Sequence, residues 1–173
     1  MESLAPQPHL VCLNLQQDMI ALSEHNTALA ALLWRMRSCL YWARSHDVPI
    51  IHAHSVTRYA PAPPIPAFEV LPCEIIIAKR SLSAFGADEW RRSMAAGCSR
   101  VLLLGLSRDC DLAATALDGV ARGVQVVLVS DAIGLERSSA ALGPNALRDL
   151  LAPAIPSITT SELVERRGLS ISN

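Results

Sequence analysis

Short runs of almost continuously apolar residues, separated by stretches with helical periodicity, constrain the fold of this chain most strongly. The runs are too short for typical helices and are rich in branched side chains, so they predict strands. They cover His9 to Leu15, Val48 to His52, Glu74 to Ala78, Val101 to Leu104, Val124 to Val129 and Ser157 to Thr159. Apolarity along a whole run predicts that both faces of the strand are buried.

Helical patterns lie between these runs, at Asn26 to Ser45, Ala87 to Ala96 and Leu112 to Arg122. Glycines follow the second and third patterns, as is typical of helix ends. A pattern from Ala140 to Leu151 contains Gly143-Pro144, which is expected to break it. The alternation predicts an α/β fold: a single three-layer Rossmann-like domain over residues 1–173, with about six strands in a mostly parallel sheet and helices on both faces. The late SELVER segment is expected to close the domain.

Composition limits the classes of partner. The 173 residues are 51% hydrophobic, enough for one well-buried core, and the formal net charge is -1 with scattered Lys and Arg. This charge pattern argues against a nucleic acid or an anionic membrane as partner and favours a small molecule or another protein. The N-terminus resembles no secretion signal and no apolar run reaches about 18 residues, so a cytoplasmic location is expected.

The cysteines predict neither a disulfide framework nor a metal centre. There are five of them, an odd number, and none are spaced as CxxC or as a zinc site. No metal or other cofactor is therefore expected.

The segment from Tyr59 to Pro72 contains five prolines and little charge. Proline has no backbone N–H to donate, so an extended loop between the second and third strands is expected. Several interpretations remain open: a rigid surface connection, a wall of a pocket, or a contact with a neighbouring subunit.

Polar residues stand where three of the predicted elements meet one edge of the sheet. Asn14 ends the first strand, Lys79 ends the third, and Asp111 begins the helix after the fourth. Ligands of open α/β sheets bind beyond the carboxyl ends of the strands. The three side chains are therefore expected to converge around one cavity.

The segments LVCLNLQQDM, IIIAKRSLSAF and VLLLGLSRDCDLAATALDG resemble the isochorismatase-like family, which includes cysteine hydrolases of small amides. The resemblance covers about Leu10 to Val164 and extends to the runs VVLVSDA and ITTSELV. Its pattern Lys-x-x-x-Ser-Ala-Phe is present from Lys79. At the positions where cysteine-using members carry Asp and Cys, this chain has Asn14 and Asp111.

The resemblance implies a site of known type with an altered reaction. In the family, a Cys thiolate attacks a carbonyl carbon, a Lys favours that anion, and an Asp moves the proton. Isochorismatases proper hydrolyse a vinyl ether without the Cys and rely on the acid. Asn14 cannot move a proton and Asp111 is a poor substitute for a thiol, so neither route is expected here. The resemblance also implies a cis peptide at Leu106-Ser107 and substrate-binding roles for Met19, Phe85, His54, Leu106, Ser107 and Cys110.

Alternative interpretations exist for each catalytic candidate. Asp111 also suits a helix N-cap, Lys79 a solvated strand end, and Asn14 a turn. Cys110 would be the nucleophile only if the loop were shifted by one residue, which rotates a helical side chain by about 100°.

His52 and His54 share one face of the predicted second strand, as metal ligands do. Nicotinamidase-like relatives carry a metal site at this strand end, but residue 57 is Thr, so a third ligand is missing. We expect core or pocket histidines instead.

The sequence therefore predicts an isochorismatase-like hydrolase of a small carbonyl-containing or enol-ether metabolite, with Asp111 as a general base and no cysteine nucleophile. The alternative is a catalytically degenerate member that serves as a ligand-binding or oligomeric scaffold protein. A homo-oligomer is also expected, because the Pro-rich loop and Trp34, Tyr41 and Trp42 on the long helix supply apolar surface.

Overall fold

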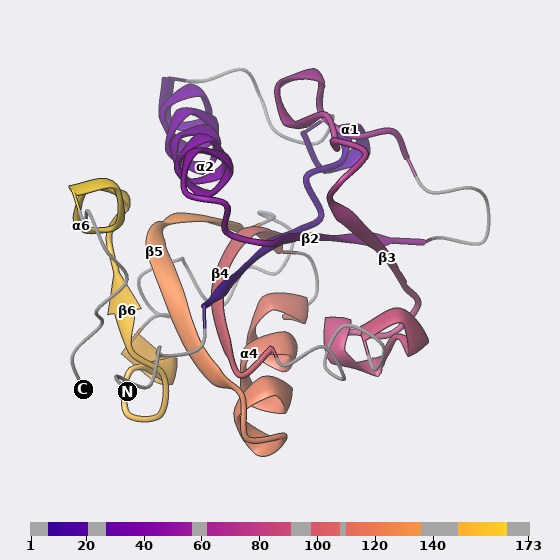
Figure 1. Ribbon diagram of the computed structural model, residues 1–173, viewed down its shortest axis with the longest axis vertical. Coiled ribbons are helices and arrows are strands. Elements are labelled where there is room, and N and C mark those ends of the chain that lie inside the picture. Colours follow the sequence, from indigo (N-terminus) through magenta and orange to yellow (C-terminus); the bar gives the residue numbers. More distant parts are fainter. Residues whose placement is uncertain are drawn as a thin grey trace.

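A computed structural model describes residues 7–20, 27–56, 62–90, 98–107, 110–135 and 149–165 of the protein. One six-stranded sheet with the order β3-β2-β1-β4-β5-β6 runs through the molecule (Figure 1). Every pair of neighbouring strands is parallel. The strands are β1 (His9–Leu13), β2 (Ile50–Ser55), β3 (Ile75–Lys79), β4 (Arg100–Ser107), β5 (Gln125–Leu135) and β6 (Ser157–Ile158).

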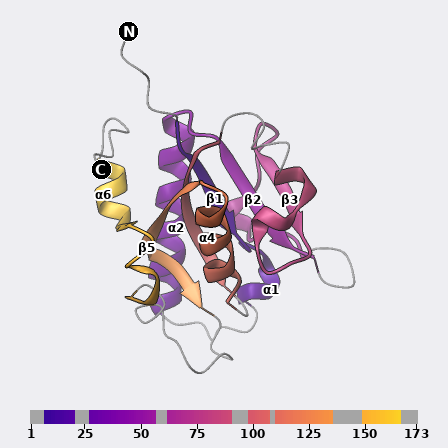
Figure 2. The ribbon, with the colours of Figure 1, turned by 90° about the horizontal axis from the view of Figure 1, so that it is seen from below.

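Helices cover both faces of the sheet and create two cores. On one face, α1 (Gln17–Ile20), α2 (Thr27–Ser45) and α6 (Thr160–Glu165) pack over the cluster that contains Leu10, Leu102 and Val127. On the other face, α4 (Asp111–Ala121) packs over the cluster that contains Val11, Leu103 and Val126. Figures 1 and 2 show α6 beside α2, with the sheet between these helices and α4. The predicted three-layer α/β fold is confirmed.

Local sequence signals set the ends of two helices. Gly123 adopts a left-handed conformation (φ 77°) just after α4, which a glycine accommodates without strain. Before α6, the Glu162 N–H donates to Thr159 Oγ1 (3.2 Å) and the Thr159 N–H donates to Glu162 Oε2 (2.6 Å). This reciprocal pair is a capping box, and it explains why the SELVER segment begins its helix there.

Two other predicted helices are only partly described. Residues 88–90 are helical, but the rest of the predicted Ala87 to Ala96 helix lies outside the described residues. Residues 149–151 are also helical, while Gly143-Pro144 and most of the predicted Ala140 to Leu151 pattern lie outside them. In the Pro-rich segment, residues 62–72 are described and include a short 3₁₀ helix, η1 (Pro66–Phe68). A second 3₁₀ helix, η2 (Ala84–Gly86), follows β3.

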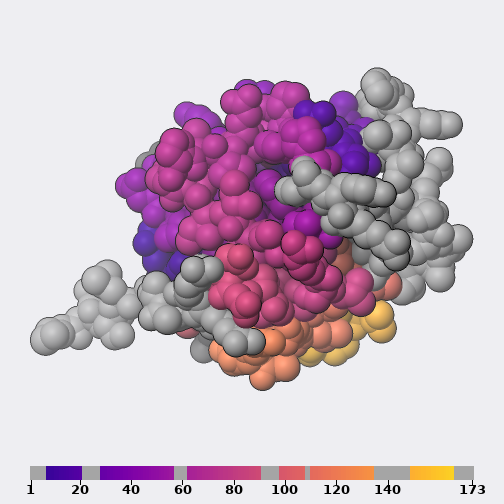
Figure 3. All heavy atoms as spheres, turned by 90° about the vertical axis from the view of Figure 1, so that its right-hand side faces the viewer, coloured from indigo at the N-terminus to yellow at the C-terminus, as the bar shows by residue number. Residues whose placement is uncertain are grey.

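Two predictions about burial are wrong. Continuous apolarity predicts that both faces of β3 are buried, but Ile75 and Ile76 are exposed because β3 is an edge strand. Figure 3 shows this side of the molecule, where the magenta surface of residues 62–90 lies above the orange surface of later residues. On α2, Trp34 and Tyr41 are exposed as expected, whereas Trp42 points into the core. None of the described helices is long and apolar enough to cross a membrane.

Candidate active site

Two of the three polar residues, Asn14 and Asp111, stand where the sheet order reverses between β1 and β4, and the third, Lys79, ends the edge strand β3. Asn14 follows β1, Lys79 is the last residue of β3, and Asp111 is the first residue of α4, after β4. Because β1 and β4 are neighbours but their crossover connections run in opposite directions, a crevice is expected beyond their carboxyl ends. All three side chains are almost completely buried there.

The Asp111 carboxylate joins the three residues. Its Oδ2 accepts hydrogen bonds from Asn14 Nδ2 (2.5 Å) and Lys79 Nζ (2.9 Å), and its Oδ1 accepts one from Ser107 Oγ (2.7 Å). Asn14 Nδ2 also donates to the Leu106 carbonyl oxygen (2.9 Å). The predicted convergence of Asn14, Lys79 and Asp111 is confirmed as geometry.

A glycine in β4 makes this geometry possible. Gly105 has a φ of 131°, and a Cβ at this position would lie 2.2 Å from the Leu13 carbonyl oxygen. Any other residue would therefore force β1 and β4 apart. Their close approach lets the Asn14 side chain reach the Leu106 carbonyl at the end of β4.

The structure distinguishes between the alternative roles of these three residues. Asn14 is both a turn residue and a member of the cluster, because its φ is 50° and the Gln16 N–H donates to its carbonyl oxygen (2.7 Å). Lys79 is not a solvated strand end, since only 4% of the residue is exposed. Asp111 is not the N-cap of α4. That position belongs to Cys110.

Cys110 and Asp111 face different surroundings. Cys110 has a left-handed backbone conformation (φ 65°) and is exposed, whereas Asp111 is 2% exposed and points into the cluster. The shift by one residue that would make Cys110 the nucleophile is therefore absent. The predicted cis peptide is also absent: none occurs among the described residues, which include Leu106 and Ser107.

Several predicted substrate-binding residues have packing roles. Met19 and Leu106 lie in the core under α2, and the Phe85 ring packs against Trp90 with ring centroids 4.2 Å apart. Ser107 donates its hydroxyl to Asp111 and accepts from the Leu112 N–H (3.2 Å). Contact of these residues, His54 or Cys110 with a substrate stays a prediction.

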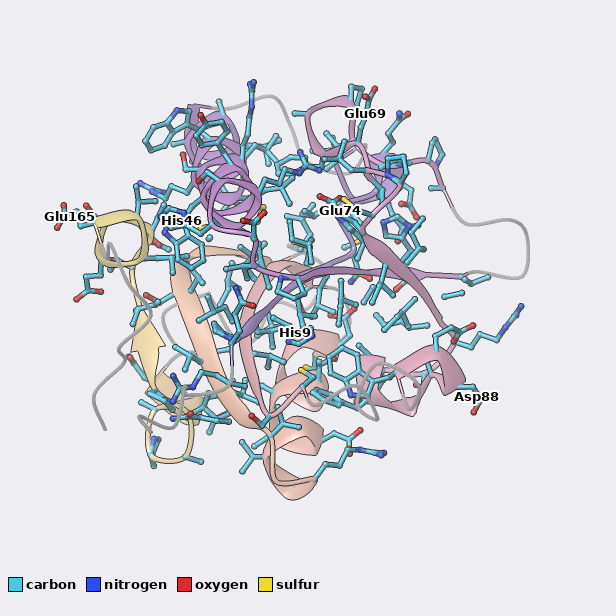
Figure 4. The ribbon with its side chains drawn as sticks, viewed as in Figure 1. His9, His46, Glu69, Glu74, Asp88 and Glu165 are labelled. Atoms are coloured by element: carbon cyan, nitrogen blue, oxygen red, sulfur yellow. The ribbon has the colours of Figure 1, made fainter. Side chains whose placement is uncertain are left out.

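A second buried polar cluster was missed by the sequence analysis. Arg44 on α2 donates from Nε to Glu74 Oε1 (2.7 Å) and from Nη2 to Glu74 Oε2 (3.0 Å), while His52 Nε2 lies 2.9 Å from Oε2. The Leu71 N–H also donates to Glu74 Oε2 (3.0 Å). Glu74 stands directly before β3, at the end of the strand opposite Lys79 (Figure 4). Nothing in the sequence identified it, because its partners come from three separate elements.

Burial sets the charge of the histidines beside this cluster. Desolvation, together with the smaller effect of the neighbouring His52, lowers the pKa of His54 to about 4. Desolvation also lowers the pKa of His52, although the hydrogen bond to Glu74 opposes it. For Glu74, burial raises the pKa, but the hydrogen bonds from Arg44, the Leu71 N–H and His52 outweigh it, so the pKa is lowered. Both rings are therefore neutral at pH 7, as buried histidines at a core position would be.

The residues of the described ranges contain no group of three His, Cys, Asp or Glu side chains placed to hold a metal ion. The cluster formed by Asn14, Lys79 and Asp111 can provide hydrogen-bond donors to a ligand. An ammonium has three N–H donors, and among the described residues Lys79 Nζ has one hydrogen-bond partner, Asp111. The two remaining donors of this buried group are suited to a carbonyl oxygen or an oxyanion.

Comparison with known proteins places the chain in a family. The family model described as the isochorismatase domain matches residues 8–142. No curated protein matches the chain. Many solved structures share its fold.

Three of these structures illustrate the similarity. An isochorismatase-like hydrolase from Alkaliphilus metalliredigens has 17% sequence identity and a TM-score of 0.78, covering 92% of this chain and 98% of that one. A cysteine hydrolase from Pseudomonas syringae has 16% identity and a TM-score of 0.79, with 91% of each chain covered. N-carbamoylsarcosine amidase from Thermoplasma acidophilum has 18% identity and a TM-score of 0.77, covering 94% and 100%. At these identities the structures establish the fold, and the match of the family model over residues 8–142 shows that the chain belongs to the isochorismatase family of hydrolases.

Proposed function

We propose that the protein hydrolyses a small carbonyl-containing or enol-ether metabolite without a cysteine nucleophile. The observation that carries this proposal is the position of the Asp111 carboxylate. It lies at the start of α4, between Asn14 Nδ2 and Lys79 Nζ, where cysteine-using relatives are expected to hold their thiol. The cysteine next to it in the chain, Cys110, is exposed, whereas Asp111 is buried.

Each member of the cluster has a role in this proposal. Asp111 acts as a general base that takes a proton from a water molecule, whose oxygen adds to the electrophilic carbon of the substrate. The protonated Asp111 then returns the proton to the leaving group as the bond between that group and the carbon breaks. Lys79, which has donors left over among the described residues, binds the oxygen on which negative charge develops, and it balances the charge of the carboxylate. Asn14 holds Asp111 through Nδ2 and replaces the proton-moving acid of relatives with a fixed donor.

A screen of the purified protein against small amides, esters and vinyl ethers tests the proposal. We expect turnover of one of these classes, unchanged after all accessible thiols are blocked with iodoacetamide, and no covalent acyl adduct in intact-protein mass spectra. An acyl adduct on Cys110 would contradict the proposal and would assign the reaction to a thioester route.

A binding role without turnover is the second candidate function. It is favoured by the hydrogen bonds that Asp111 already accepts from Asn14, Lys79 and Ser107, because a base must be free to accept a proton from its substrate. In this role the free Lys79 donors would hold a carbonyl or carboxylate group of a ligand. Binding of a ligand without turnover in the same screen would support it.

We further propose that the protein is a homo-oligomer. Support comes from a groove of about 840 Å³ between α2 and α6, which is bordered by the exposed Trp34 and Tyr41. Its walls carry both signs of charge, Arg37 on α2 and Glu165 on α6, so two copies related by a two-fold axis can pair them. Figure 4 labels Glu165 and His46 on this side of the molecule. Light scattering should give a molar mass that is a multiple of 18.6 kDa. Trp34→Glu should lower the measured mass toward that of the monomer.

We also propose that the chain is one domain and that the protein is cytoplasmic. Residues 1–173 form one hydrolase domain, which is supported by a single sheet whose strands span residues 9–158. The protein is cytoplasmic, which is supported by five free cysteines, three of them buried without a disulfide.

A further inference from the structure

We infer that Ser55, the last residue of β2, is a positioning residue of the site and that it acts through Asn14. An Asn side chain has a carbonyl oxygen on one side and an NH2 group on the other, and its partners decide the orientation. The Leu106 carbonyl oxygen can only accept a hydrogen bond, so the atom 2.9 Å from it is Nδ2. The Asn14 Oδ1 atom then faces Ser55 Oγ, which donates to it at 2.8 Å.

The Ser55 hydroxyl therefore stabilises one orientation of the amide. A flipped amide would place Oδ1 against two acceptors, the Leu106 carbonyl and Asp111 Oδ2, at the distances now occupied by Nδ2. Asn14 is completely buried, so bulk water does not compensate for a lost donor. Without the hydroxyl, Asn14 Oδ1 loses its donor, and only the two acceptors on the Nδ2 side still favour the orientation that binds Asp111.

Gln16 holds Ser55 in place for this role. The Ser55 N–H donates to Gln16 Oε1 (2.8 Å), and Gln16 Nε2 donates back to the Ser55 carbonyl oxygen (3.2 Å). β1 ends at Leu13, which pairs with Ala53, so Ser55 extends beyond its neighbouring strand on that side. The Gln16 side chain supplies there the donor and the acceptor that the backbone of β1 no longer provides.

The same amide connects Ser55 to the Pro-rich segment. Gln16 Nε2 also donates to the Ala62 carbonyl oxygen (3.1 Å), and residue 16 forms a bridge with Pro64. Gln16 is buried, and both of its Nε2 hydrogens and its Oε1 are used by these contacts. The position of this segment is thereby connected through Gln16 and Ser55 to the orientation of Asn14.

Hydrogen exchange of the Asn14 side-chain NH2 group, measured by ¹⁵N NMR, tests this inference. Ser55→Ala should accelerate the exchange by about fivefold or more, because the amide loses the partner of Oδ1. Ser55→Thr keeps the hydroxyl and should retain the exchange rate of the parent protein. Ser130→Ala is the matched control, since it removes another strand serine that donates to a backbone carbonyl, Ile158 O, away from the site.

Kinetics supply a second readout, which rests on the proposed function. With any substrate that the parent turns over, Ser55→Ala should lower kcat by about fivefold to tenfold with little change in KM, and Ser55→Thr should restore it. If the parent turns over no substrate, the proposed function fails, and the amide exchange still decides the role of Ser55.

Three results would overturn the inference. The first is that the Asn14 amide of the parent exchanges at the rate of an exposed amide. The second is that its exchange rate is the same in Ser55→Ala as in Ser130→Ala. The third is that Ser55→Ala and Ser55→Thr change the exchange rate equally. If Ser55→Ala does not fold, Ser55→Cys keeps a weaker donor at the same position and should accelerate the exchange to a smaller extent. No acceleration in that variant would also overturn it.

Discussion

Two buried carboxylates, Asp111 and Glu74, stand near opposite ends of the sheet, and each forms an ion pair with one basic residue. Asp111 is paired with Lys79, and the side chains of both are almost fully buried. Glu74 is paired with Arg44, whose side chain is 29% exposed, through two parallel hydrogen bonds. Glu74 also has His52 and the Leu71 N–H as partners, and Arg44 donates to the Glu69 carbonyl oxygen.

The difference separates a structural cluster from a site. The Glu74 cluster joins α2, β2 and the start of β3, and its fork-shaped guanidinium is matched to the carboxylate, as in ion pairs that fix a geometry. In the Asp111 cluster, the ammonium is buried without such matching and keeps unused donors among the described residues. A buried polar group with spare donors is costly for folding, and this cost is typical of groups that bind or react.

Removal of the cation should have the largest effect on stability. Lys79→Met leaves the Asp111 carboxylate buried without an opposite charge and should lower the free energy of unfolding by about 3–5 kcal/mol. Arg44→Met should lower it by only about 1–3 kcal/mol, because Glu74 keeps His52 and the Leu71 N–H. Urea denaturation of the two variants measures both values.

A control separates charge burial from packing. Lys79→Met/Asp111→Leu removes both partners and should recover most of the stability lost in Lys79→Met, since replacing a whole buried pair with apolar groups is often nearly neutral. Equal losses in Lys79→Met and Arg44→Met would show that the two clusters do not differ in the way described.

Substitutions that change or swap the amide at position 14 and the carboxylate at position 111 should have an intermediate effect on stability. Asn14→Asp places a second carboxylate 2.5 Å from Asp111 Oδ2 and against the Leu106 carbonyl, so we expect a loss of about 2–3 kcal/mol. Asn14→Asp/Asp111→Asn contains one acid and one amide again and should recover part of that loss without recovering turnover. Thermal unfolding of both variants at one pH provides the comparison, and a double variant less stable than Asn14→Asp would disprove the coupling.

The last expected effect is a pH dependence that comes from His54 on β2, the neighbour of His52. Because the folded-state pKa of His54 is about 4, below its ordinary value of 6.5, the unfolded chain binds a proton between these values that the folded chain does not. Stability should therefore fall as the pH is lowered from 6.5 toward 4. In His54→Gln the melting temperature should change less with pH between 6.5 and 4 than it does in the parent. An unchanged slope in His54→Gln would assign the dependence to other groups, such as His52, whose pKa is also lowered.

The sequence predicts the sheet and the location of the site better than the side-chain contacts within them. Apolar runs and helix-ending glycines are local signals, and Asn14, Lys79 and Asp111 stand at strand ends by position alone. Exposure of Ile76 depends on β3 being an edge, which no local pattern reports. Ser55 carries no motif, and its role follows only from the orientation of the Asn14 amide.

The Glu74 cluster was beyond prediction for a related reason. Its members are separated by 22 and 30 residues along the chain and meet only when α2 packs beside β2 and the start of β3. Gln16 lay inside a recognised motif, yet its partners, Ser55 and Ala62, come from segments that the motif does not include.

The most direct test compares two adjacent residues, Cys110 and Asp111, in one assay. With a substrate found in the screen, kcat/KM is measured for the parent, Cys110→Ala and Asp111→Asn at the same pH. A buried carboxylate that acts as the base predicts that Cys110→Ala retains the parent value and that Asp111→Asn loses at least about 100-fold. Loss of activity in Cys110→Ala together with retention in Asp111→Asn would contradict hydrolysis by the carboxylate.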